Sequence, residues 1–204
     1  MKKLKDRLYH TADWEIIIDE GPDIRGIDPA LMFRKTHAEY IYHSYYPVFI
    51  AERGYHSRPI MRVDLCLKEN KDTLSIFINH WSSRRGGKAQ TDPFRIYAAG
   101  ILLDAVKEVR KMHPDYTILM TGDFNDDSCD SCLQILYREP GIQYLKKDLP
   151  DGVQGTYYYN GEWTSFDHFL ISFPVSPVFT TRDVRISALA LDQRKRNGRP
   201  IAIL

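Results

Sequence analysis

One segment with helical periodicity, placed between stretches that have the pattern of strands, constrains the fold of this chain most. Thr91 or Asp92 can cap a helix here, and Pro93 is suited to its first position. The apolar residues that follow fall on one helical face: Phe94, Ala98, Ile101, Leu102, Ala105, Val109 and Met112. We therefore expect a helix that begins near Thr91 and ends before Pro114.

Strand patterns surround this helix. The stretches Met61–Lys68 and Leu74–His80 are separated by the turn-like E-N-K-D, so they predict a hairpin. The other expected elements are a short basic helix at 2–10, strands at 14–18, 30–34, 116–121 and 166–172, and a short helix capped by Asp130 or Ser131 that reaches Tyr137.

Strands joined both by a hairpin and by a helix predict an α/β (α+β) sandwich, with mixed sheets inside and helices outside. The sequence has no internal repeat and no low-complexity linker, so we expect one domain over residues 1–204. In such layers the side chains at strand ends converge at one edge of the sheet, where catalytic groups are commonly placed.

The composition is that of an ordinary soluble globular protein, with 43% apolar and 27% charged residues. The net charge of +1 gives no whole-molecule attraction for polyanions, so any nucleic-acid contact needs a local basic surface. The clusters Arg84-Arg85 and Arg194-Lys195-Arg196 could make one, or could be solvated surface. The sequence gives no indication of the oligomeric state.

The cysteines and the N-terminus exclude several classes of protein. An odd count of three cysteines argues against a disulfide framework. Cys129 and Cys132 have no second C-x-x-C to complete a zinc site, so we expect a pair of cysteines at a helix start. The basic N-terminus lacks an apolar signal segment, and no run approaches the roughly 20 residues of a membrane span. We expect a cytoplasmic protein as given, or an exported one if a signal lies upstream.

The tetrapeptide G-D-F-N at 122–125 is the sharpest chemical signal. A strand leaving the core presents Asp123, and Asn125 can point the same way if the chain stays extended. Gly122 would let the backbone come close to a ligand. A carboxylate can hold a metal or orient water, and an amide can donate to a phosphate oxygen. Turn chemistry explains the same residues, so the tetrapeptide alone leaves both interpretations open.

Two other strand ends carry polar groups. Asn79 and His80 lead into S-S-R-R-G-G, where His80 could donate to a phosphate and Arg84 could complement its charge, or both could be structural. Asp167 lies at the start of the last apolar strand and could fix an imidazole. Most of the tyrosines at 157–159 before it are expected to be core and rim packing.

Taken in order, several segments resemble a bacterial branch of the endonuclease/exonuclease/phosphatase superfamily, which includes deoxyribonuclease I. They are GPDIRGIDPALMF, SRPIMRV, FINHWSSRRGG, FRIYAAGILL, ILMTGDFNDD and GTYYYNGEWTSFDHFLIS, spanning roughly residues 14 to 173. The resemblance implies a deoxyribonuclease I-like four-layer sandwich of mixed β-sheets flanked by helices. It also implies a phosphoesterase that uses Mg²⁺ or Mn²⁺ and acts on a phosphate-ester substrate or nucleic acid.

The same resemblance implies roles for single residues. His80 looks like the histidine that contacts the scissile phosphate, and Asp123 and Asn125 look like the pair that orients water, stabilises charge and binds metal. Asp167 is similar to an aspartate that pairs with a catalytic histidine from a following segment, and His168 is expected to be a flanking residue. Arg58 looks like an arginine near the phosphate, with Asn79 and Arg84 as further candidate substrate contacts.

The chain also departs from the family pattern. The family places an asparagine on its first strand and a metal-binding glutamate on the next element, both upstream of the region where this chain begins, and it closes with a serine-aspartate-histidine triplet. We find no candidate for these residues in this sequence, so we expect a partial domain whose catalysis is weak or absent. The alternative is a catalytically impaired remnant or fragment that acts as a phosphate- or nucleic-acid-binding module.

Overall fold

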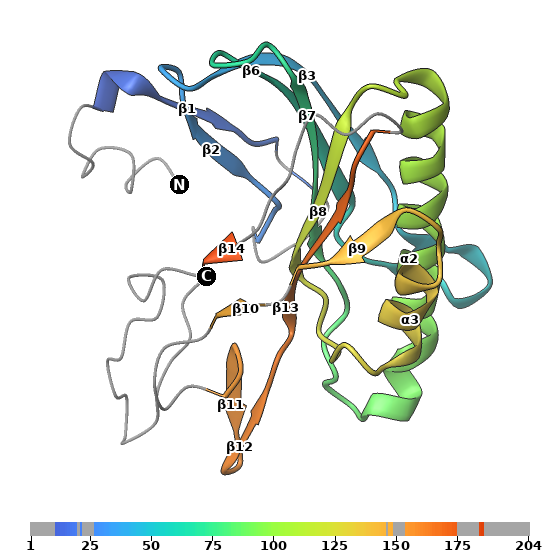
Figure 1. Ribbon diagram of the computed structural model, residues 1–204. Coiled ribbons are helices and arrows are strands. Elements are labelled where there is room, and N and C mark those ends of the chain that lie inside the picture. Colours follow the sequence, from blue (N-terminus) through green and yellow to red (C-terminus); the bar gives the residue numbers. More distant parts are fainter. Residues whose placement is uncertain are drawn as a thin grey trace.

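The computed structural model describes residues 11–19, 21, 27–145, 147–148, 154–174 and 184–185. Its centre is a six-stranded sheet with the order β3-β6-β7-β8-β13-β9 (Figure 1). The strands are β3 (Ala38–Tyr46), β6 (Ile60–Leu67), β7 (Thr73–His80), β8 (Thr117–Asp123), β13 (Asp167–Ser172) and β9 (Ile142–Tyr144). Strands β7 and β8 are parallel, whereas every other neighbouring pair in this sheet is antiparallel.

The two faces of this sheet are covered differently. Helices α2 (Lys88–Met112) and α3 (Ser131–Tyr137) lie on one face, and the antiparallel pair β1 (Trp14–Ile17) and β2 (Leu31–Arg34) lies on the other (Figure 1). Each side has its own buried cluster, one around Phe77, Leu102 and Met120 and one around Phe33, Met61 and Val63. This arrangement confirms the mixed-sheet α+β sandwich.

The remaining elements are short. They are η1 (Thr11–Asp13), η2 (Ala51–Arg53), the pair β4 (Phe49–Ile50) and β5 (Tyr55–His56), the pair β10 (Lys147–Asp148) and β14 (Val184–Arg185), and the hairpin β11 (Tyr157–Tyr159) and β12 (Glu162–Thr164). Among the described residues, no helix is both long enough and apolar enough to cross a membrane.

The predicted strands are all confirmed to within two residues. The structure differs from the prediction at helix α2 and at β3. Helix α2 begins at Lys88 instead of near Thr91, because side chains hold its extra first turn: the Thr91 hydroxyl donates to the carbonyl oxygen of Gly87 and the Arg95 guanidinium donates to that of Lys88. Edge strand β3 was not expected at all. The basic helix predicted at 2–10 and the cluster at 194–196 lie outside the described residues.

Candidate active site

Three strand ends meet at one edge of the central sheet. Because β7 and β8 are parallel, His80 and Asp123 end their strands side by side and are partners in register. Strand β13 runs the other way, so it starts at this edge, and Asp167 is the register partner of Asp123 on its other side. Residues that lie 43 and 44 positions apart in the sequence, His80 with Asp123 and Asp123 with Asp167, are thus brought into one row.

His80 and Asp123 face a groove of about 1400 Å³. Their side chains are 32% and 28% exposed, and His80 Nε2 lies 3.8 Å from Asp123 Oδ2, too far for a direct hydrogen bond. Asp167 differs from them because it is 6% exposed and does not line the groove. The pair at the groove can therefore reach a ligand, whereas Asp167 lies behind it.

The environment of Asp123 favours its protonated form more than water does. Burial raises the pKa of this carboxyl above 3.8, although the backbone N–H of Asn125 and the charge of Arg58 act against the shift. The N–H of Asn125 donates to Asp123 Oδ1 over 2.8 Å. A carboxyl group with a raised pKa in a groove is a candidate proton acceptor.

Asn125 does not continue the strand, as the extended reading of G-D-F-N required. It takes a left-handed conformation, with φ of 53°, which asparagine tolerates better than most residues. Its Nδ2 donates to the carbonyl oxygen of Trp81 over 3.0 Å. Asn125 therefore fixes the loop after β8 and holds Asp123 in place through its own backbone.

Gly122 serves a purpose that the sequence did not reveal. Its φ is 130°, and a Cβ at this position would overlap the backbone of Asn79 on β7. The glycine thus permits close approach of two strands, in place of the expected approach of backbone to a ligand. It brings the ends of β7 and β8 together.

The three predicted substrate contacts are placed differently from one another. Arg58 lines the groove, and its guanidinium donates to the carbonyl oxygens of Ile27 and His80 over 3.1 and 3.4 Å. Asn79 is 2% exposed and its amide is bonded within the fold, to Phe77, Thr121 and Trp81. The groove therefore receives Arg58 and not Asn79.

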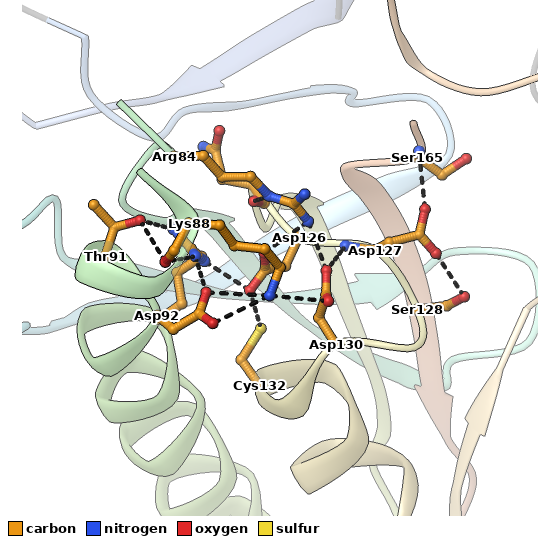
Figure 2. Close-up of polar contacts among 12 residues, drawn as sticks. Arg84, Lys88, Thr91, Asp92, Asp126, Asp127, Ser128, Asp130, Cys132 and Ser165 are labelled. Carbon is orange, nitrogen blue, oxygen red and sulfur yellow. Dashed lines mark hydrogen bonds and ion pairs between the residues drawn. The ribbon is translucent and has the colours of Figure 1, made fainter. Parts of the chain in front are cut away.

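Arg84 lines the groove, but carboxylates behind the groove already balance its charge. Its Nη2 lies 2.8 Å from Asp126 Oδ1 and donates to Asp130 Oδ2 over 2.6 Å, and its Nε donates to the carbonyl oxygen of Asn125. Lys88 reaches Asp130 from helix α2, as Figure 2 shows. Arg84 thus holds the loop that carries Asp123 and Asn125.

A buried ion pair completes this network. Arg95 is 0% exposed and donates through Nε to Asp126 Oδ2 over 2.7 Å, with Asp92 and Thr91 as further partners. Figure 2 shows how Asp126 and Asp130 face the start of helix α2. The sequence carried a signal for this, since Arg95 falls on the same helical stripe as Ala98, and a buried arginine requires an acidic partner.

Cys132 and His168 are bonded within the fold. Cys132 is buried in the first turn of α3 and Cys129 is exposed, and the Cys132 thiol lies 3.1 Å from Asp126 Oδ2. Burial raises the pKa of the Cys132 thiol, and the neighbouring Asp126 adds to the shift. His168 is fully buried, with Nε2 2.8 Å from the carbonyl oxygen of Asp126.

The tyrosines at 157–159 do not all pack in the core or rim. They form strand β11, which a turn at Asn160-Gly161 joins to β12, with φ of 50° and 90° at the two turn residues. Tyr157 and Tyr159 are 43% and 58% exposed and line the groove. The Asn-Gly pair between alternating residues was the available sign of a hairpin.

The chain matches the Endonuclease/Exonuclease/phosphatase family over residues 2–182. It belongs to this family. The fold agrees, because the human Nocturnin catalytic domain matches 84% of this chain with a TM-score of 0.59 and 13% identity. A mannosyl-6-phosphatase from Bacteroides thetaiotaomicron matches 84% with a TM-score of 0.62 and 15% identity, and D. rerio TDP2 complexed with a single-strand DNA product matches 86% with a TM-score of 0.62 and 14% identity.

This chain spans 63%, 66% and 68% of the length of those three structures, or about two thirds. The comparison with curated proteins finds no match. Family members hydrolyse phosphoester bonds, and the deoxyribonuclease I-like fold expected from the resemblance is confirmed.

The fit of a metal ion rests on few residues. Among the described residues, no group of three or more His, Cys, Asp or Glu side chains is placed to hold an ion. Asp123 and Glu162 are the carboxylates among the groove-lining residues. Since Mg²⁺ is commonly bound through one or two carboxylates plus water and substrate phosphate, Asp123 fits an open site of this kind. Asn125 also lines the groove; its Nδ2 donates to the carbonyl oxygen of Trp81, so its Oδ1 is the atom that could bind an ion.

Proposed function

We propose that this member of the Endonuclease/Exonuclease/phosphatase family is a metal-dependent phosphoesterase whose groove binds a phosphate ester between His80 and Asp123. The observation that carries the proposal is the register of β7 and β8. It places His80 Nε2 3.8 Å from Asp123 Oδ2 in an open groove. Both phosphodiesters and phosphomonoesters fit this chemistry.

The proposed roles of the groove residues follow from their hydrogen-bonding groups and charges. The His80 imidazole donates a hydrogen bond to a phosphoryl oxygen, while the Asp123 carboxylate accepts a proton from the attacking water. Arg58 adds positive charge beside Asp123. Mg²⁺ or Mn²⁺, held by Asp123, would polarise the phosphate and stabilise the charge on the leaving oxygen, which departs as its bond to phosphorus breaks and takes a proton from solvent.

In this proposal Asp167 helps to position His80 and Asp123 without lining the groove. It is 6% exposed, its backbone N–H donates to the Thr156 hydroxyl over 3.1 Å, and it borders Asp123 in register. A buried carboxylate in this position can fix the orientation of neighbouring polar groups without touching the substrate.

Acid should weaken metal binding, because protons and Mg²⁺ compete for the same carboxylate. In the metal-free chain burial raises the pKa of Asp123, so the affinity for Mg²⁺ should fall as the pH is lowered through that raised pKa. In a pH profile of kcat/KM, saturating Mg²⁺ should therefore move the loss of activity to lower pH.

The test is hydrolysis of bis(p-nitrophenyl) phosphate and of nicked DNA in a Mg²⁺ titration with the purified chain. We expect turnover that requires Mg²⁺ and that falls by about a hundredfold or more in His80→Ala. His113→Ala is the matched control, because His113 lies at the end of helix α2 and does not line the groove. Cleavage without metal, or cleavage that survives the loss of His80, would defeat the proposal.

The same assays separate this proposal from a binding module that uses the same groove. If inorganic phosphate or DNA binds and no ester is hydrolysed at any Mg²⁺ concentration, the chain is a binding module. Turnover at millimolar Mg²⁺ rejects that alternative.

A further inference from the structure

The hairpin β11–β12 presents two different faces. Tyr157 and Tyr159, which alternate along β11, line the groove together with their cross-strand partners Thr164 and Glu162. Tyr158 is directed to the other side and packs on Trp163, with ring centroids 5.0 Å apart. One tyrosine completes a small apolar cluster, whereas the other two are exposed in the groove.

The groove-facing rings form a row. Tyr159 and Tyr157 are nearly parallel, with centroids 6.2 Å apart and an interplanar angle of 21°. Tyr157 is also stacked on Phe166, at 4.8 Å and 22°. Phe166 is 8% exposed and Tyr159 is 58% exposed, so the row leads from the buried edge of the site out to solvent.

The inner end of this row is joined to the candidate catalytic loop. The Arg84 guanidinium lies 4.7 Å from the Phe166 ring, and Arg84 Nε donates to the carbonyl oxygen of Asn125. The carbonyl oxygen of Phe166 accepts from the N–H of Phe124 over 2.8 Å. The row and the pair His80 and Asp123 therefore line one groove, and the loop after β8 connects them.

The other aromatic residues and the size of the groove fit a chain-like ligand. Tyr55 and Phe94 are stacked on each other at 3.9 Å and also line the groove. Its volume of about 1400 Å³ exceeds the roughly 300–1,000 Å³ that pockets for small molecules occupy. Arg58 and Arg85 supply positive charge to a lining that also holds the carboxylates of Asp123 and Glu162.

We propose, building on the proposed phosphoesterase function, that the substrate is single-stranded nucleic acid whose base next to the scissile phosphate stacks on Tyr157 and Tyr159. Parallel aromatic rings in a groove that also holds arginine side chains can bind bases through their planar faces, whatever the sequence. Bases in a duplex are already stacked on one another, so this row of rings selects unpaired strands.

The test measures binding in EDTA, so that it does not depend on turnover. A short fluorescein-labelled oligothymidylate and an abasic strand of equal length are titrated with the full chain by fluorescence anisotropy at fixed salt. The variant Tyr157→Leu/Tyr159→Leu should bind the intact strand about fivefold to a hundredfold more weakly, and the abasic strand as the unmodified chain does. Tyr157→Phe/Tyr159→Phe keeps both rings and should restore the affinity.

Controls separate stacking from folding. Tyr97→Leu changes an exposed tyrosine on helix α2 that does not line the groove, and it should bind like the unmodified chain. If the double leucine variant fails to fold, Tyr159→Leu alone carries the test, since this side chain is 58% exposed. Circular dichroism checks folding in each case.

Two outcomes overturn the inference: equal affinity of the unmodified chain for intact and abasic strands, or unchanged base dependence in the folded leucine variant. Either one, found together with Mg²⁺-dependent hydrolysis of bis(p-nitrophenyl) phosphate, leaves the proposed function standing. Base-dependent binding without any hydrolysis supports the stacking surface and contradicts the phosphoesterase.

Discussion

The segment 122–130 carries aspartates on two sides of one loop, and the two sides have opposite environments. On the groove side, burial raises the pKa of Asp123, and its carboxylate is partly exposed. On the helix side, Asp126 is 2% exposed between Arg84 and Arg95, and Asp130 meets Arg84 and Lys88. The same residue type thus serves a candidate reaction on one side and stability on the other.

This difference teaches that the partners of a carboxylate, and not its degree of burial alone, set its role. Asp126 is more buried than Asp123, yet two guanidinium groups compensate its charge. Asp123 has one backbone donor and the more distant charge of Arg58. An undercompensated carboxylate at a groove can exchange a proton, whereas a compensated one fixes the loop.

The largest effect should come from Asp123→Asn. We expect hydrolysis to fall by about a hundredfold to ten-thousandfold, because an amide cannot accept the proton of water. Stability at pH 7 should stay equal or rise, since the folded state no longer holds an ionised group that burial disfavours. Phosphodiester hydrolysis and thermal unfolding measure the two effects.

Asp104→Asn is the control for this substitution, because Asp104 is exposed on helix α2 away from the groove. It should change neither quantity. A clear loss of Tm in Asp123→Asn would show that the Asp123 carboxylate stabilises the fold as Asp126 and Asp130 do, and would contradict the difference drawn between them.

Asp126→Asn should have the next largest effect, on stability. It removes one of the two carboxylates that pair with the buried guanidinium of Arg95, and it also removes a partner of Arg84, so unfolding in urea should show a loss of about 3 kcal/mol. Asp104→Asn again serves as control. A loss within the error of the urea titration would mean that Asp92 alone balances Arg95.

Asp130→Asn should act in a pH-dependent way. Burial alone would raise the pKa of Asp130, but the Asp127 N–H, Lys88 and Arg84 hold it below 3.8. A depressed folded pKa stabilises the fold above the unfolded pKa, and this contribution is lost as the pH falls through the folded value. The variant should lose about 1 kcal/mol at pH 7 and converge with the unmodified chain in acid. A difference that stays constant with pH would exclude the ionic cause.

The smallest effect concerns the two cysteines near the start of helix α3. Cys129 is exposed, whereas burial raises the pKa of the Cys132 thiol, and only thiolates react readily. Iodoacetamide should therefore alkylate Cys129 and leave Cys132 unmodified in the folded chain, as peptide mass mapping would show. Alkylation of Cys132 at a similar rate would indicate that the ion network opens in solution.

The strands that form the site could be predicted because each is a continuous apolar run with one polar end. Tyr116–Thr121 and Phe166–Ser172 have that pattern, so the positions of Asp123 and Asp167 at the sheet edge followed. The order of the strands in the sheet could not be predicted, because the order of strands along the chain does not determine that β8 lies between β7 and β13.

The features that were missed depend on tertiary contacts. Strand β3 is an edge strand with many aromatic residues and a bulge near Tyr40, so it lacks a clean alternation. The first turn of α2 depends on Arg95, whose partner Asp126 comes 31 residues later. The side chain of Asn125 followed turn chemistry, not the extended form, because the loop closes on Trp81.

The central claim is that His80 and Asp123, which the register of β7 and β8 brings together, act on one phosphoryl group. A double-mutant cycle on kcat/KM for bis(p-nitrophenyl) phosphate with Mg²⁺ tests it, using His80→Ala, Asp123→Asn and the double variant. Residues that act as a unit give non-additive losses, so the double variant should be no slower than the slower single variant. Losses that multiply, or no turnover by the unmodified chain, would contradict the account.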